Sequence, residues 1–148
     1  MALALALARI LAGAIWLLNL AWKLPPDFGR HDARGLYHWL VLARRNAVSP
    51  PLRAFVRDVV LPNYTVFGYL VFAIEVIAGV LLLLGFATRI GAALGTGQAL
   101  VIGLMVAEAP GEWRLAYVML AFLNALPLIA PADTRLSLDA ELGRTPYL

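Results

Sequence analysis

One carboxylate stands inside a long apolar segment of the chain. Residues 62–89 read PNYTVFGYLVFAIEVIAGVLLLLGFATR, and Glu75 lies near the middle of them. About twenty apolar residues in a row can cross a bilayer as a helix, and a charge at that depth costs about 3 kcal/mol. We therefore expect Glu75 to be paired, protonated or functional, and it is the first candidate catalytic residue.

Three other strongly polar side chains occur at similar depth in the remaining apolar segments. Counted from the membrane edge at which the chain begins, Arg9 and Asn124 are about 10 Å deep. Glu75 and Gln98 are about 15 Å deep on the same count. An arginine side chain can span this difference, so we expect an ion pair between Arg9 and Glu75 with the two amides hydrogen-bonded around it. Arg9 is the second candidate catalytic residue, and Gln98 and Asn124 are candidate ligand-binding residues.

This buried polar core has two interpretations. An ion pair surrounded by amides can fix the register of four helices without doing chemistry. Alternatively, Glu75 exchanges protons with a bound ligand such as a quinone headgroup, because ionisable residues inside a membrane commonly mark functional sites. The residues alone leave both interpretations open.

The composition places these residues in a membrane protein. The chain is 62% hydrophobic and 14% charged, whereas soluble domains are roughly 45–50% apolar and 25% charged. It has no cysteine, which excludes thiolate catalysis and thiolate-held metals. No nucleotide-binding or catalytic zinc pattern occurs, so we expect no metal. The net charge of +3 fits arginines near lipid headgroups, and we expect no nucleic-acid partner.

The expected fold is all-α, an integral membrane four-helix bundle that forms a single domain over residues 1–148. The spans are expected at about residues 2–24, 62–86, 89–108 and 112–130, followed by a polar tail over 131–148. Trp22 and Lys23 mark the end of the first span as an aromatic belt residue and a snorkelling cation. Thr88 is expected to cap the third span, in which Gly91 and Gly95 form a small-residue face for close helix contact.

The connection over residues 27–61 is too long for a structureless loop in a compact protein, so we expect amphipathic surface helices there. In the first of them, the apolar face Leu36, Leu40 and Ala43 lies apart from Arg34, His38 and Arg45. A second helix is expected to begin with Ser49 as the N-cap and Pro50 at the first position. Its arginines, Arg53 and Arg57, are placed opposite Phe55, Val59 and Val60.

Aromatic and histidine side chains gather at the membrane edge where this connection lies. They are Trp22, His31, Tyr37, His38, Trp39, Tyr64, Tyr69, Trp113 and Tyr117. They form either an aromatic belt at headgroup level or a pocket under the surface helices, with His31 or His38 as a proton carrier. His38 is accordingly a candidate ligand-binding residue.

Four short sequence patterns in the chain resemble those of a known protein family. They are Arg9-x-x-x-Gly13, Lys23-Leu24-Pro25, Glu75-x-x-x-Gly79 and Leu83-Leu84-Gly85-Phe86-Ala87-Thr88-Arg89. In these patterns the chain resembles the DoxX/DoxD family, whose members are small four-helix membrane proteins. DoxD is the membrane subunit of a thiosulfate:quinone oxidoreductase. The resemblance therefore implies a membrane subunit of a quinone-linked redox complex that oxidises a reduced sulfur compound, with quinone as a cofactor that is not covalently bound.

In that interpretation Arg89 joins the candidate quinone-binding residues, because it closes the last of the four patterns. Arg34, Arg44 and Arg45 would draw an anionic substrate toward the membrane. The alternative is a noncatalytic membrane anchor or assembly subunit of a larger complex, and a small carrier or channel is a third function. Whether the chain is itself an enzyme stays open.

The expected partners are the lipid bilayer and either other protein subunits or further copies of the chain. The expected location is a cell membrane, crossed several times, in particular the inner membrane of a prokaryote. Of the twelve Lys and Arg residues, eight lie on the side of the connection and four on the side of the termini. This distribution favours a cytoplasmic connection, whereas the family resemblance implies cytoplasmic termini, so the orientation stays open.

Overall fold

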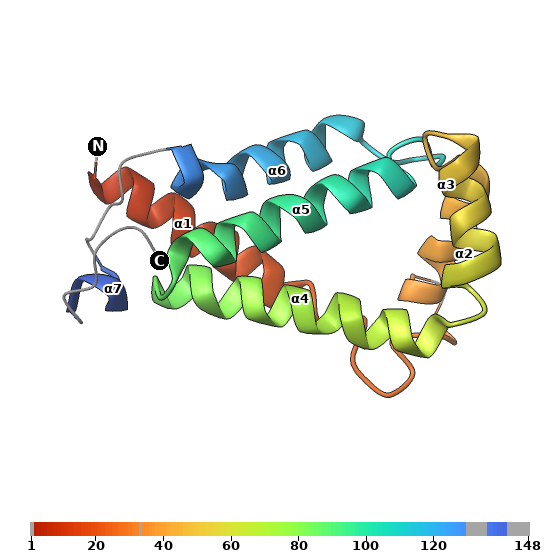
Figure 1. The fold of residues 1–148 in the computed structure, drawn as a ribbon, viewed down its shortest axis with the longest axis horizontal. Helices are drawn as coiled ribbons and strands as arrows, with labels where there is room; N and C mark the ends of the chain where they lie inside the picture. The colour runs from red at the N-terminus through yellow and green to blue at the C-terminus, as the bar shows by residue number, and fades with distance from the viewer. Residues whose placement is uncertain (1, 33, 130–135, 142–148) are drawn as a thin grey trace.

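Four long helices lie side by side in the computed structural model, which describes residues 2–32, 34–129 and 136–141 (Figure 1). They are α1 (Ala2–Leu18), α4 (Tyr64–Leu84), α5 (Thr88–Val106) and α6 (Arg114–Ile129). Helices α1 and α5 each pack against both α4 and α6, so the four form a closed bundle. The described residues contain no strand, which confirms the all-α fold. Most of the expected polar tail, 131–148, lies outside the described residues.

Helices α4 and α5 have the length and composition of membrane-spanning helices. Helix α4 has 21 residues and α5 has 19, and both are long and apolar enough to cross a membrane. The apolar helices α1 and α6 are shorter, with 17 and 16 residues. Helix α1 ends at Leu18, although the sequence predicts a span that continues to residue 24.

The hairpin between α4 and α5 is tight because its residues suit a sharp helix end. Gly85 follows α4 in the left-handed conformation, with φ of 65°, which glycine adopts without a steric penalty. Helix α5 begins three residues later, at Thr88. The apolar run thus ends where the glycine predicts, and Glu75 and Gln98 lie on the two arms of one hairpin.

The connection between α1 and α4 forms a cap across one end of the bundle (Figure 1). The cap contains α2 (Leu36–Asn46), α3 (Pro50–Phe55) and the single-turn π-helix η1 (Val56–Val60). The predicted apolar face of α2 is buried, and α3 begins with Pro50, so these predictions are confirmed. Ser49 occupies the N-cap position as predicted, but its side chain makes no capping hydrogen bond. In the second helix the buried residues are Val56 and Val60, whereas Phe55 and Val59 are exposed, because the π-turn shifts the buried face.

The short helix α7 (Leu138–Glu141) lies at the opposite end of the bundle (Figure 1). The Asp139 carboxylate accepts hydrogen bonds from the backbone N–H groups of Ala87 and Thr88 at 3.1 and 3.3 Å, and from the Thr88 hydroxyl at 3.2 Å. A carboxylate at a helix N-terminus satisfies free N–H groups and complements the helix dipole. The cap of α5 is therefore Asp139, and the prediction that Thr88 caps this helix is wrong.

The small-residue face of α5 allows close packing, as predicted. A methyl group added at Gly91 would lie 2.8 Å from the Leu81 Cβ of α4. One added at Gly95 would lie 2.9 Å from the indole nitrogen of Trp16 and closer still to the Asn124 side chain. Gly95 thus leaves room for a contact between α1 and α6.

Gly95→Ala is expected to destabilise the protein by about 1–3 kcal/mol, because the new methyl group overlaps the Trp16 and Asn124 side chains. Gly97→Ala on the same helix is the matched control, since nothing lies within 4 Å of a Cβ at Gly97. The control should be neutral or gain up to about 1 kcal/mol from helix propensity. Thermal unfolding in detergent measures both, and equal stability of the two variants would contradict this packing.

Candidate functional site

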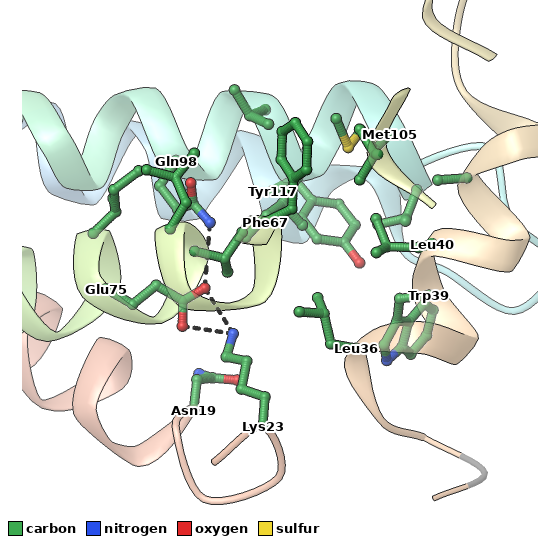
Figure 2. Close-up of a pocket in the computed structure, with 18 of the residues that line it drawn as sticks. Asn19, Lys23, Leu36, Trp39, Leu40, Phe67, Glu75, Gln98, Met105 and Tyr117 are labelled. Atoms are coloured by element: carbon green, nitrogen blue, oxygen red, sulfur yellow. Dashed lines mark hydrogen bonds and ion pairs between the residues drawn. The ribbon is translucent and has the colours of Figure 1, made fainter. Parts of the chain in front are cut away.

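The Glu75 carboxylate is held by a lysine and an amide inside the bundle (Figure 2). Its Oε2 lies 2.6 Å from Lys23 Nζ, and the two side chains are only 0% and 5% exposed. Its Oε1 accepts hydrogen bonds from Lys23 Nζ at 2.7 Å and from Gln98 Nε2 at 3.3 Å. The structure therefore places the predicted pair Glu75 and Gln98 together, and the counter-charge is Lys23.

Lys23 reaches Glu75 because α1 ends early. The chain turns after Leu18, and a backbone hydrogen bond of 3.0 Å from Lys23 N–H to the Leu20 carbonyl belongs to this turn. Lys23 is 4% exposed, so it does not snorkel to the membrane surface as predicted. A carboxylate in a low-dielectric interior needs a nearby opposite charge, and the long lysine stem supplies it from the turn.

Arg9 lies beside the last residues of α4 and not beside Glu75, so the predicted Arg9–Glu75 pair is wrong. The guanidinium donates to the carbonyls of Leu82 and Leu83, the latter at 3.3 Å, and to the carbonyl of Leu136 at 2.6 Å. The last carbonyls of a helix lack partners within the helix and carry its negative dipole end. Arg9 therefore stabilises the end of α4 and joins it to the segment that contains α7.

Asn124 makes a separate polar contact between α6 and α1. Its Oδ1 accepts a 2.9 Å hydrogen bond from Trp16 Nε1, and its Nδ2 donates to the Leu120 carbonyl at 2.8 Å. The asparagine is fully buried. The bond from Trp16 fixes α1 against α6, which is the structural role that buried amides have in membrane bundles.

The other two candidate residues lie outside this core. Arg89 is half-buried in the first turn of α5, at the α7 end of the bundle. His38 is exposed on α2, where its ring lies edge-on to Trp39 at 5.5 Å. Neither residue lines the cavity described below.

A cavity of about 660 Å³ lies between the bundle and the cap. Its polar end is formed by Glu75, Lys23 and Gln98, and Figure 2 shows the apolar and aromatic side chains that continue from there toward α2. They include Phe67, Leu40, Met105, Trp39 and Tyr117. Ligand sites in proteins have volumes of about 300–1,000 Å³, mostly apolar walls and a few convergent polar groups. The cavity has this character.

Of the aromatic residues predicted at this membrane edge, some line the cavity and others are exposed as in an aromatic belt. Trp22, Trp39 and Tyr117 line the cavity, as expected of an aromatic pocket. Trp113 is 62% exposed, as expected of a membrane belt. Tyr37 of α2 and Tyr64 of α4 pack edge-on to each other at 5.4 Å.

Lys23 is the site residue that the sequence patterns place elsewhere, at the membrane surface. The sequence did contain a signal for it, since an apolar chain that buries one carboxylate needs one buried cation. Two cations near the ends of the first apolar segment, Arg9 and Lys23, could meet this need. The choice between them depends on where α1 stops.

The fold and the site define a small helical membrane protein with an internal cavity that is polar at one end. A protein-family model, DoxX, matches residues 34–108. This match covers half of the chain, and the protein belongs to the DoxX family. The matched residues contain the cap, Glu75, Gln98 and the α4–α5 hairpin. Comparisons with curated proteins and with solved structures found no significant match.

Proposed function

We propose that this DoxX protein is a membrane subunit of a quinone-linked redox complex and that the cavity binds the quinone headgroup. One observation carries the proposal: the mostly apolar cavity of about 660 Å³ ends at a carboxylate, an ammonium group and an amide. A quinone headgroup has the matching chemistry, because its ring is apolar and its carbonyl oxygens accept hydrogen bonds. Lys23 Nζ and Gln98 Nε2 are the available donors.

Glu75 supplies the proton chemistry in this proposal. Reduction of a quinone to a quinol consumes two electrons and two protons. The electrons come from a reduced sulfur compound such as thiosulfate, two ions of which are joined through a new S–S bond to give tetrathionate. The Glu75 carboxylate takes up a proton from the aqueous side and passes it to a quinone oxygen, once for each of the two protons that the quinol needs. Arg34, which is exposed and lines the cavity, attracts anions toward its mouth.

Tryptophan fluorescence gives a direct test of quinone binding. Trp16, Trp22 and Trp39 line the cavity, so a short-tailed quinone titrated into the protein in lipid nanodiscs should quench the emission in a saturable way. Val71→Phe, which places extra volume in the cavity wall, should weaken binding about tenfold. Val118→Phe is the control, because Val118 is 61% exposed on α6 and does not line the cavity.

Equal affinities for the two variants would show that quinone does not occupy the cavity. A folded protein without saturable quenching would contradict the proposal as a whole. That result would favour a noncatalytic anchor or assembly subunit.

A further inference from the structure

The wall of the cavity is open at a set of apolar side chains. Leu70, Val101 and Phe55 line the cavity, and they are 51%, 45% and 41% exposed. A side chain that faces a cavity and is also half exposed lies where the wall opens to the surroundings. The three residues come from α4, α5 and the end of α3, so the opening has helices on two sides and the cap above.

The course of α4 and α5 explains why the opening is there. The two helices meet at the hairpin, where Gly91 lies against Leu81, and they separate toward the cap (Figure 1). Leu70 and Val101 lie in the separated halves, about 9 Å and 8 Å along their helices from the cap end. Phe55 packs edge-on to the cavity residue Phe67 at 6.2 Å and thereby borders the opening from the cap.

The surroundings expected at this point are hydrocarbon. Both α4 and α5 are long and apolar enough to span a membrane, and the opening lies within their length. Other exposed residues that line the cavity, Asn19 and Arg34, are polar and come from the segments that follow α1 and precede α2. The cavity therefore has an apolar opening between α4 and α5, and its exposed polar lining residues come from other segments.

We propose that the ligand enters sideways from the bilayer between α4 and α5, and that its apolar tail stays in this opening while its headgroup reaches Glu75. This inference rests on the proposed quinone function and narrows the substrate class to lipid-dissolved quinones with long tails. A tail that remains against Leu70, Val101 and Phe55 exchanges lipid contacts for similar side-chain contacts, so it need not leave an apolar environment.

Two matched double variants test the opening. Leu70→Phe/Val101→Phe adds bulk at its two helical sides. Val66→Phe/Leu104→Phe adds the same bulk one helical turn away, at positions that are 67% and 49% exposed and do not line the cavity. Each is placed in nanodiscs, and tryptophan quenching gives the rate and affinity for a many-isoprene quinone and for its one-isoprene analogue, with quinone expressed per lipid.

The opening variant should bind the long-tailed quinone about tenfold more slowly and more weakly than wild type. Its affinity for the short-tailed quinone should stay within about twofold, and the control variant should resemble wild type for both. Unchanged binding of the long-tailed quinone, or equal weakening of both quinones, would overturn the lateral opening while leaving the quinone site intact.

The binding of wild type itself tests the quinone function separately from the lateral opening. If neither quinone binds wild type saturably, the quinone assignment is overturned. In that case, saturable binding of a fluorescent long-chain fatty acid that is weakened only in the opening variant would still support a lateral opening for apolar tails. Absence of that effect would overturn the opening as well.

Discussion

Lys23→Met is expected to lower the free energy of unfolding by about 3–5 kcal/mol, because it leaves a buried carboxylate without its counter-charge. The Lys23 and Glu75 side chains are 5% and 0% exposed, and Nζ lies 2.6 Å from Oε2. Removing one partner of such a pair costs more than the pair contributes, since the remaining charge keeps its desolvation penalty. Denaturation by SDS in mixed micelles measures the loss.

The matched control is an ion pair of the same length at the surface. Arg114 and Glu108 also approach to 2.6 Å, but their side chains are 68% and 39% exposed. Arg114→Met should therefore cost at most about 1 kcal/mol. If Lys23→Met lowers the free energy of unfolding no more than this control does, Lys23 is not needed to neutralise a buried charge on Glu75.

The double variant Lys23→Met/Glu75→Gln completes the cycle. It removes both charges and keeps the amide of Gln98 hydrogen-bonded to a side chain of the same size. We expect it to recover about 2–3 kcal/mol of the stability that Lys23→Met loses. Additive losses in the double variant would show that the two residues do not interact.

Glu75→Gln is expected to reduce quinone turnover about 100-fold or more, because an amide cannot take up a proton and pass it on as the carboxylate does. Quinone affinity should change by less than about tenfold, since the substitution conserves the size and shape of the polar end. The measurement is thiosulfate-dependent reduction of a short-tailed quinone by native membranes in which the variant replaces the natural chain. Tryptophan quenching gives the affinity separately.

Two controls separate lost chemistry from lost structure. Glu108→Gln removes an exposed carboxylate that does not line the cavity, and it should leave turnover unchanged. The variant Lys23→Met/Glu75→Gln should be only about 1–2 kcal/mol less stable than wild type and still inactive. Normal turnover with Glu75→Gln would exclude a proton-transfer role for Glu75 and leave the structural role of the buried pair.

The depth of the residues in the central hairpin could be predicted because a tight turn links its two helices. Glu75 lies ten residues before Gly85 and Gln98 lies eleven residues after Ala87, so each is about three helical turns from the hairpin. Counting residues outward from a shared turn places both side chains at the same level, and the structure joins them by a 3.3 Å hydrogen bond. Local residue types also predicted the start of α3 at Pro50.

The cation that pairs with Glu75 could not be identified by counting residues in the same way. A long connection separates α1 from α4, so no short turn sets the axial position of one helix against the other. The prediction continued α1 to residue 24, which placed Lys23 at the membrane surface and left Arg9 as the buried cation. Because the helix stops at Leu18, Lys23 turns inward to Glu75 and Arg9 bonds to the end of α4.

The sequence by itself determined that this is an all-helical membrane protein with a carboxylate and an amide facing each other on a central hairpin. Apolar runs, a helix-ending glycine and the regular rise of a helix are local properties, and they need no tertiary information. Only the tertiary structure decided which cation pairs with Glu75, and only it showed that the cap encloses a cavity with an apolar opening. These features depend on the axial offset of α1 and on how the cap folds across the bundle, which no local pattern encodes.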